Sequence, residues 1–144
     1  MHSQEQVEMI VQALFDAKPK DIARFMSENQ AGMRAVLRLL YVSDEVMTAG
    51  KIAQEIGVSG ARVAALLKKM VEKNLIVKEP AANDARVTIV RLTPYGIDIA
   101  NALQQELYEQ IGNVIDKIGI DRMIEFVSIS KEIHEALAPP TISI

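Results

Sequence analysis

Cysteine is absent from the sequence, which excludes disulfide bonds, redox sensing by a thiol of the chain and catalysis by a cysteine nucleophile. Histidine is scarce. His2 and His134 are the only two, and no acid–histidine cluster has the spacing of metal ligands, so we expect no structural metal site. No apolar run approaches the ~20 residues of a membrane span, and residues 1–10 lack the basic start and apolar run of a secretory signal. We therefore expect a cytoplasmic protein without a membrane partner.

Recognisable catalytic motifs are also absent. The sequence contains no G-x-S-x-G, no P-loop, no dinucleotide-binding glycine pattern and no H-E-x-x-H. Its carboxylates are many, but they are scattered over the outer faces of the expected helices. We therefore set an enzyme aside and expect neither catalytic residues nor a cofactor.

The formal net charge is -3, which argues mildly against a nucleic-acid partner. The distribution of charge argues the other way. Residues 48–93 hold eight basic and four acidic residues, whereas the rest of the chain holds eight basic and fifteen acidic residues. A basic segment in an acidic frame can bind phosphate locally while the whole protein stays soluble. An ordinary scatter of charge is the alternative explanation.

Residues 48–93 begin with two short amphipathic patterns separated by a tight turn. Thr48 is the expected N-cap of a helix over residues 49–56. Gly57 is expected to end it, because glycine readily adopts the positive φ found at helix ends. The pattern predicts a helix, a turn and a second helix.

The second helix is expected over residues 60–73, with Ser59 as its N-cap. Its lysines Lys69 and Lys73 are a like-charged pair one turn apart, which is slightly unfavourable unless a polyanion lies nearby. Both lysines could equally remain in water. Apolar residues at helical spacing form the expected buried stripe: Val63, Leu66, Leu67, Met70 and Val71.

A β-hairpin is expected next. Residues 75–78 and 87–92 are rich in β-branched residues and predict two strands. Residues 80–86 between them are polar and turn-forming, so we expect a turn there and no strand. Thr93 followed by Pro94 is a strong start signal for another helix.

Helices flank this central part on both sides. Ser3 is the expected N-cap of a first helix, Pro19 interrupts that pattern, residues 28–30 form a break, and residues 31–42 read as helix again. After Pro94, apolar residues step by threes and fours over a long helix: Ile97, Ala100, Leu103, Leu107, Ile111, Val114 and Ile118.

The last expected helix follows a break at Gly119, and Asp121 is its predicted N-cap. The terminal helices carry more apolar surface than a small central domain could cover. We infer that they pack against those of a second copy in a two-fold symmetric dimer. An intramolecular helical bundle remains the alternative.

Helix, turn, helix and hairpin together form the layout of a winged helix-turn-helix. In such a fold the second helix enters the major groove of DNA and the first crosses the backbone. Arg62 is the best candidate for a base contact, because its planar fork can pair with guanine. Lys68, Lys69 and Lys73 would hold phosphates, and the small residues Gly60 and Ala61 allow close approach at the positive helix end.

Residues 48–96 resemble the MarR family of transcriptional regulators. Asp84-Ala85-Arg86 is similar to the family's D-x-R wing, and Leu92-Thr93-Pro94-Tyr95-Gly96 is similar to its L-T-x-x-G start of the next helix. Outside this stretch only the lengths and order of the helices match. The upstream residues that also fit the family's pattern are Ile52, Ala53, Ser59, Leu66, Asn74, Leu75 and Ile76.

The resemblance implies a homodimer that binds pseudo-palindromic double-stranded DNA, usually as a repressor. It implies one MarR-like domain over residues 1–144, mainly α with a small β wing. Residues 31–96 would form the winged helix-turn-helix lobe, and residues 1–30 and 97–144 the dimerisation helices. It also implies that Arg86 enters the minor groove, where narrow A·T-rich stretches attract arginine, and that Asp84 braces the wing.

Two sets of candidate site residues follow. The predicted effector-binding residues are Met33, Leu37, Tyr41 and Met70, because family members often release DNA when a small molecule enters the crevice beside the dimer helices. Filling of the core is the alternative role for these residues. The predicted DNA-contacting residues are Lys51, Ser59, Gly60, Ala61, Arg62, Ala65, Lys68, Lys69, Lys73, Asp84 and Arg86.

The sequence also departs from the family. Ala64 and Ala65 stand where family members often carry Arg, Thr or Gln, and Lys78-Glu79 stands where they often carry arginines. Both changes weaken the expected grip on DNA. They leave open a second function, that of a winged-helix protein that has lost DNA reading and acts as a protein-binding adaptor or antirepressor.

Overall fold

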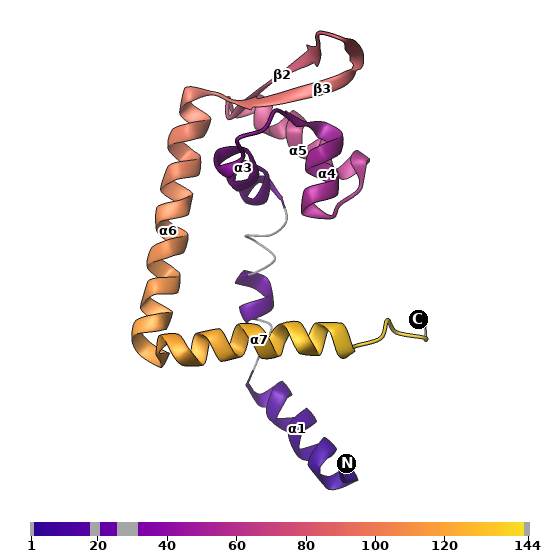
Figure 1. Ribbon diagram of the computed structural model, residues 1–144, viewed down its shortest axis with the longest axis vertical. Helices are drawn as coiled ribbons and strands as arrows, with labels where there is room; N and C mark the ends of the chain where they lie inside the picture. The colour runs from indigo at the N-terminus through magenta and orange to yellow at the C-terminus, as the bar shows by residue number, and fades with distance from the viewer. Residues whose placement is uncertain (1, 18–20, 26–31, 143–144) are drawn as a thin grey trace. The chain divides into compact units, whose positions relative to one another are not determined.

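The computed structural model describes residues 2–17, 21–25 and 32–142 (Figure 1). It is mainly α-helical with one small sheet, which confirms the predicted fold class. Two units divide the chain, Met1–Leu103 and Gln104–Ile144. The elements are α1 (Gln4–Asp16), α3 (Met33–Val42), β1 (Met47–Thr48), α4 (Ala49–Ile56), α5 (Gly60–Glu72), β2 (Ile76–Ala81), β3 (Asp84–Leu92), α6 (Pro94–Ile118) and α7 (Ile120–Ala136).

Capping residues set the bounds of the predicted helix pair. The Oγ1 of Thr48 accepts a hydrogen bond from the Lys51 N–H at 3.2 Å at the start of α4. Gly57 ends α4 with a φ of 69°, which glycine adopts at little cost. The Oγ of Ser59 accepts a hydrogen bond from the Arg62 N–H at 3.2 Å at the start of α5. All three predicted caps are confirmed.

The predicted turn between the wing strands is too long. The sheet is antiparallel in the order β1-β3-β2. The expectation that residues 80–86 form no strand is wrong, because β2 continues past Pro80, β3 begins at Asp84, and only residues 82–83 form the turn. Pro80 lies opposite Thr88 in the register. Proline is tolerated there because β2 is an edge strand, whose outward N–H groups have no partner strand.

The core lies between α3, α4, α5 and the sheet, and Figure 1 shows these helices on one side of the β2–β3 hairpin. The stripe predicted on α5 is confirmed for Val63, Leu67 and Met70, which are buried, and Leu66 packs against the core. Its last member, Val71, is 41% exposed. Val71 is turned about 100° from its buried neighbour Met70, and α5 ends at Glu72 rather than Lys73. The buried core residues are Val36, Leu37, Met47, Ile52, Val63, Leu67, Met70, Leu75, Ile76, Val90 and Ala100.

A buried junction joins the end of α5 to the start of α6. The hydroxyl of Thr93 donates to the carbonyl oxygen of Asn74 at 2.6 Å and accepts from the Gly96 N–H at 2.9 Å. The Thr93 N–H donates to the carbonyl oxygen of Leu75 at 3.0 Å. The predicted Thr93 start of α6 is therefore confirmed, and the same side chain also fixes the turn before β2.

The predicted cap of α7 is wrong. Gly119, with a φ of 92°, is the N-cap residue and α7 begins at Ile120. Asp121 lies inside the first turn instead, where its negative charge still favours the positive end of the helix. At the other end of the chain, Ser3 caps α1 as predicted, since its Oγ accepts from the Gln6 N–H at 3.2 Å.

Some predictions fall outside the described residues. They are the interruption at Pro19, the break at residues 28–30 and the lobe boundary after residue 30. Residues 21–25 between them are helical.

Gly96→Ala should destabilise the lobe, because a Cβ at this position would lie 1.9 Å from the Leu75 carbonyl oxygen. We expect urea denaturation to show a loss of about 3 kcal/mol in the free energy of unfolding. Gly50→Ala is the matched control, since a Cβ there meets nothing within 4 Å, and it should gain up to about 1 kcal/mol. Equal stability of the two variants would contradict the tight junction.

Candidate nucleic-acid interface

The outward side of α5 carries most of the predicted DNA-contacting residues. Val63, Leu67 and Met70 lie on the opposite side and are buried, so core packing fixes which side of the helix faces outward. Short side chains leave the helix surface low between its basic groups. The exposed residues from Gly60 to Lys73 are Gly60, Ala61, Arg62, Ala64, Ala65, Lys68, Lys69, Val71, Glu72 and Lys73.

The first turn of α5 offers backbone donors. An α-helix leaves its first N–H groups without partners inside the helix. Ser59 uses its Oγ to accept one of them, the N–H of Arg62. The N–H groups of Gly60 and Ala61 precede it, and both residues are exposed. This arrangement can bind a phosphate oxygen at the positive end of the helix.

The wing carries a bidentate ion pair. The Nε of Arg86 lies 3.1 Å from Oδ1 of Asp84, its Nη2 lies 3.3 Å from Oδ2, and its backbone N–H donates to Oδ1 at 3.0 Å. These hydrogen bonds hold the pKa of the Asp84 carboxyl below its usual value. The Arg86 side chain is nonetheless 91% exposed. Asp84 therefore holds Arg86 in position without covering it.

Lys51 is engaged by an acidic partner. Its Nζ donates a hydrogen bond to the carboxylate of Glu45, which lies in the loop between α3 and β1. The hydrogen bond and charge of Lys51 lower the pKa of the Glu45 carboxyl. The prediction that Lys51 contacts DNA did not include this partner. The two residues are six positions apart, and the sequence pattern carried no signal for their pairing.

A second unforeseen ion pair lies on the wing strands. The Nε of Arg91 donates to Oε1 of Glu79 at 2.7 Å. The register pairs Val77 with Arg91 and Glu79 with Ile89. Glu79 and Arg91 are therefore diagonal neighbours on one face of the hairpin. Sequence alone could have found this pair only with the register already known.

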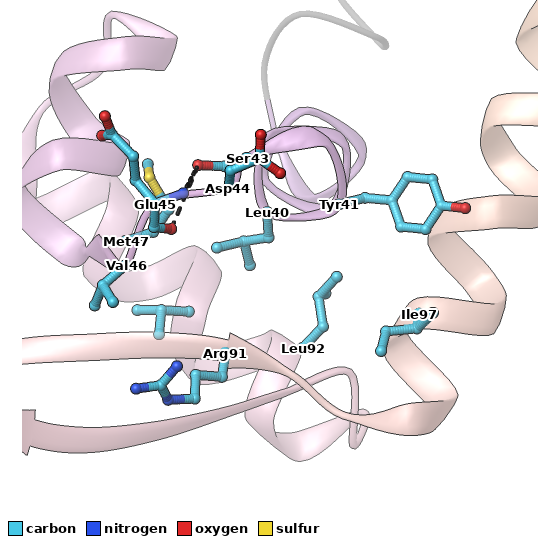
Figure 2. Close-up of a pocket in the computed structure, with 11 residues that line it drawn as sticks. Leu40, Tyr41, Ser43, Asp44, Glu45, Val46, Met47, Arg91, Leu92 and Ile97 are labelled. Atoms are coloured by element: carbon cyan, nitrogen blue, oxygen red, sulfur yellow. Dashed lines mark hydrogen bonds between the residues drawn. The ribbon is translucent and has the colours of Figure 1, made fainter.

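The four predicted effector-binding residues do not share one open site. Leu37 and Met70 belong to the buried core, and Met33 packs against it. Tyr41 lines a pocket of about 440 Å³, and its hydroxyl donates to Oδ1 of Asn101 at 3.1 Å. Figure 2 shows this pocket, which is lined by Leu40, Tyr41, Ser43, Asp44, Glu45, Val46, Met47, Val90, Arg91, Leu92 and Ile97.

Two further properties concern the described part of the chain. Within residues 2–17, 21–25 and 32–142, no group of three His, Cys, Asp or Glu side chains could hold a metal ion. None of the helices in those residues is long and apolar enough to cross a membrane.

The family model that matches residues 34–87 is that of the MarR family. The transcriptional regulator ZitR of Lactococcus lactis subsp. cremoris (strain MG1363) is 31% identical over 100 residues, which cover 65% of this chain and 69% of that protein.

Two solved structures share the fold. The MepR–DNA complex of S. aureus has a TM-score of 0.66 at 19% identity and matches 96% of this chain and 99% of that one. The haem sensor protein PefR of Streptococcus agalactiae in complex with haem has a TM-score of 0.62 at 18% identity and matches 96% of each chain. Together, the match to the family model and the relation to ZitR show that the chain belongs to the MarR family of transcriptional regulators.

Proposed function

We propose that this chain represses transcription by binding a pseudo-palindromic operator in double-stranded DNA as a homodimer. The observation that carries the proposal is the exposed side of α5, where Arg62, Lys68 and Lys69 face outward from a helix fixed by the core. The fold shared with MepR, whose structure contains DNA, supports a nucleic-acid partner.

In this proposal α5 lies in the major groove, where some of its side chains contact DNA bases and others contact phosphates. Arg62, in the first turn, contacts a base edge, because its guanidinium can donate two hydrogen bonds to guanine. Lys68, Lys69 and Lys73 contact phosphates, which fix the register of the protein but carry no sequence information. The N–H groups at the start of α5 bind one more phosphate.

The wing supplies a second contact. The exposed Arg86, held by Asp84, enters the minor groove beside the site that α5 reads. Narrow A·T-rich minor grooves have enhanced negative potential and favour an inserted arginine. Because Arg86 is already oriented by two hydrogen bonds from its side chain, little rotamer freedom is lost when it binds.

Dimerisation is supported by apolar side chains that α1 and α7 leave exposed within their own units. No residue of α7 is buried. A second copy could cover these faces, and the two lobes would then face successive major grooves ~34 Å apart. Residues 1–30 and 97–144 would form that interface. The exposed large apolar residues on these two helices include Val7, Met9, Ile10, Val11, Leu14, Ile124, Phe126, Val127, Ile129 and Ile133.

A small-molecule effector would release the operator. The pocket beside Tyr41 supports this part of the proposal, because about 440 Å³ lies within the usual range for ligand pockets. Its wall includes the loop that leads into β1 and α4. A ligand there would press on the segment that positions the first helix of the helix-turn-helix.

A protein-binding adaptor or antirepressor is the second candidate function. Its support is the pair Ala64 and Ala65, which are exposed on α5 and offer no polar group to a base. An adaptor would show no salt-dependent binding to DNA, because that dependence comes from phosphate contacts.

Selection of bound duplexes from a random library, at two salt concentrations, separates the two functions. We expect an inverted repeat to be enriched, with affinity falling steeply as salt rises because several lysines contact phosphates. No enrichment, or enrichment independent of salt, would favour the adaptor.

Arg86→Ala should weaken operator binding by about tenfold, or ~1.4 kcal/mol, and relax the preference at flanking A·T positions. Titration of labelled operators that differ only at those positions measures both effects. Arg24→Ala removes the same charge from an exposed site outside the lobe and should leave the preference intact. An unchanged preference in Arg86→Ala would rule out the assigned role of the wing.

Ile133→Lys should convert the dimer to monomers, because it places a charge on the apolar side of α7, where Ile133 is 52% exposed. Light scattering at micromolar concentration would give the particle mass, which we expect to equal two chains for the unmodified protein. Ser128→Lys adds the same charge to the polar side of α7 and should remain dimeric. A monomeric unmodified protein would remove the basis for a palindromic operator.

A further inference from the structure

We propose that two acidic side chains, Glu45 and Glu79, limit the DNA affinity of this protein by competing with phosphate for Lys51 and Arg91. The inference rests on the proposed DNA-binding function and adds two residues that set its strength. Each glutamate already forms an ion pair with a basic side chain of the lobe in the absence of DNA.

The basic groups of residues 48–93 fall into two classes. Lys51, Arg86 and Arg91 each have a carboxylate partner. The others are exposed and, within the described residues, are not part of any ion pair that the structure contains: Arg62, Lys68, Lys69, Lys73 and Lys78. The paired basic residues lie in the first turn of α4 and on β3, so pairing reduces the positive charge that these two elements offer to DNA.

The Glu79–Arg91 pair is built into the hairpin. The register of β2 and β3 makes the two residues diagonal neighbours, and the Nε–Oε1 distance of 2.7 Å is that of a charge-assisted hydrogen bond. Their side chains are 53% and 50% exposed for Arg91 and Glu79 respectively. Arg91 is therefore reachable by a phosphate, but only in competition with Glu79.

Glu45 competes with phosphate for Lys51 in the same way at the start of α4. Lys51 lies in the first turn of that helix, where its N–H is bonded to the Thr48 cap. The Lys51 side chain is 41% exposed, and its ammonium is bonded to the carboxylate of Glu45, whose side chain is 70% exposed. The first helix of a helix-turn-helix crosses the DNA backbone, so Lys51 would meet phosphate if Glu45 released it.

Competition lowers affinity in two ways. A phosphate must break an existing ion pair before it can bind the lysine or arginine. The freed carboxylate then lies close to the negatively charged backbone of the DNA. Replacing either glutamate with glutamine removes both effects while keeping the shape of the side chain. Asp84 differs, because its partner Arg86 is 91% exposed and stays free to bind while the pair persists.

Glu79→Gln and Glu45→Gln should each raise affinity for a fixed operator by about fivefold, the upper end for an exposed ion pair. Each should steepen the dependence of log affinity on log salt by about one, because one more phosphate is neutralised. Fluorescence anisotropy over a series of salt concentrations measures both quantities. Glu55→Gln is the matched control, since it removes one exposed negative charge from α4 without freeing a lysine or arginine from an ion pair.

A double-mutant cycle makes the test specific for Arg91. Arg91→Gln alone should leave the salt slope close to that of the unmodified protein, because Glu79 already pairs with Arg91, and should lower affinity only slightly, through repulsion between the unpaired Glu79 carboxylate and the DNA. In the Glu79→Gln background the same change should remove the whole gain. A large loss from Arg91→Gln alone, or a gain that survives in the double variant, would overturn the inference.

The outcomes also separate this inference from the proposed function. Salt-dependent binding by the unmodified protein, with Glu45→Gln and Glu79→Gln no tighter than Glu55→Gln, would overturn the competition and leave the function standing. Absence of binding by every variant would overturn both. Binding that appears only in the glutamine variants would support the competition and identify why the unmodified protein binds weakly.

Discussion

The carbonyl group of Leu75 is the point on which the geometry of the lobe depends. It accepts the N–H of Thr93 at 3.0 Å, and it lies so close to Gly96 that only a residue without a Cβ fits. The hydroxyl of Thr93 donates a further hydrogen bond to the carbonyl oxygen of Asn74, the residue before Leu75. Through these contacts the end of α5 and the start of α6 meet at one buried place. The helix that would read DNA and the helix that leads away from the lobe therefore cannot shift independently.

The net charge of the whole chain does not describe the charge on the exposed side of α5. The net charge of the chain is negative, yet α5 keeps its arginine and lysines exposed. Two acidic residues of the same lobe, Glu45 and Glu79, form ion pairs with Lys51 and Arg91. The central helix can therefore attract a polyanion while its surroundings moderate the attraction. Such moderation favours a complex that dissociates readily, which suits a regulator that must leave its site.

Local signals in the sequence predicted most of the lobe. The caps at Thr48, Ser59 and Thr93 came from residue types with a direct backbone role, and the structure confirms each. The errors arose where the sequence is locally ambiguous. Proline at position 80 reads as a turn unless the strand is known to be an edge, and Asp121 and Gly119 compete as start signals for α7.

The candidate site was predictable only in part, for a related reason. The outward side of α5 follows from helical periodicity within one segment. The partners of Lys51 and Arg91 depend on how separate segments meet, which a linear pattern does not encode. The division of the four proposed effector residues also depends on how segments meet, since Leu37 and Met70 are buried in the core while Tyr41 packs against it and lines a pocket.

The edge strand β2 has a consequence for the behaviour of the protein at high concentration. An open edge with unpaired backbone groups invites a strand from another molecule to add to the sheet. Here Pro80 removes one donor, the register is irregular directly after it, and Lys78 and Glu79 place charges along the same short strand. These features discourage the addition of a strand from another molecule, so the wing can remain exposed to solvent, as its proposed role requires, without becoming a nucleus for aggregation.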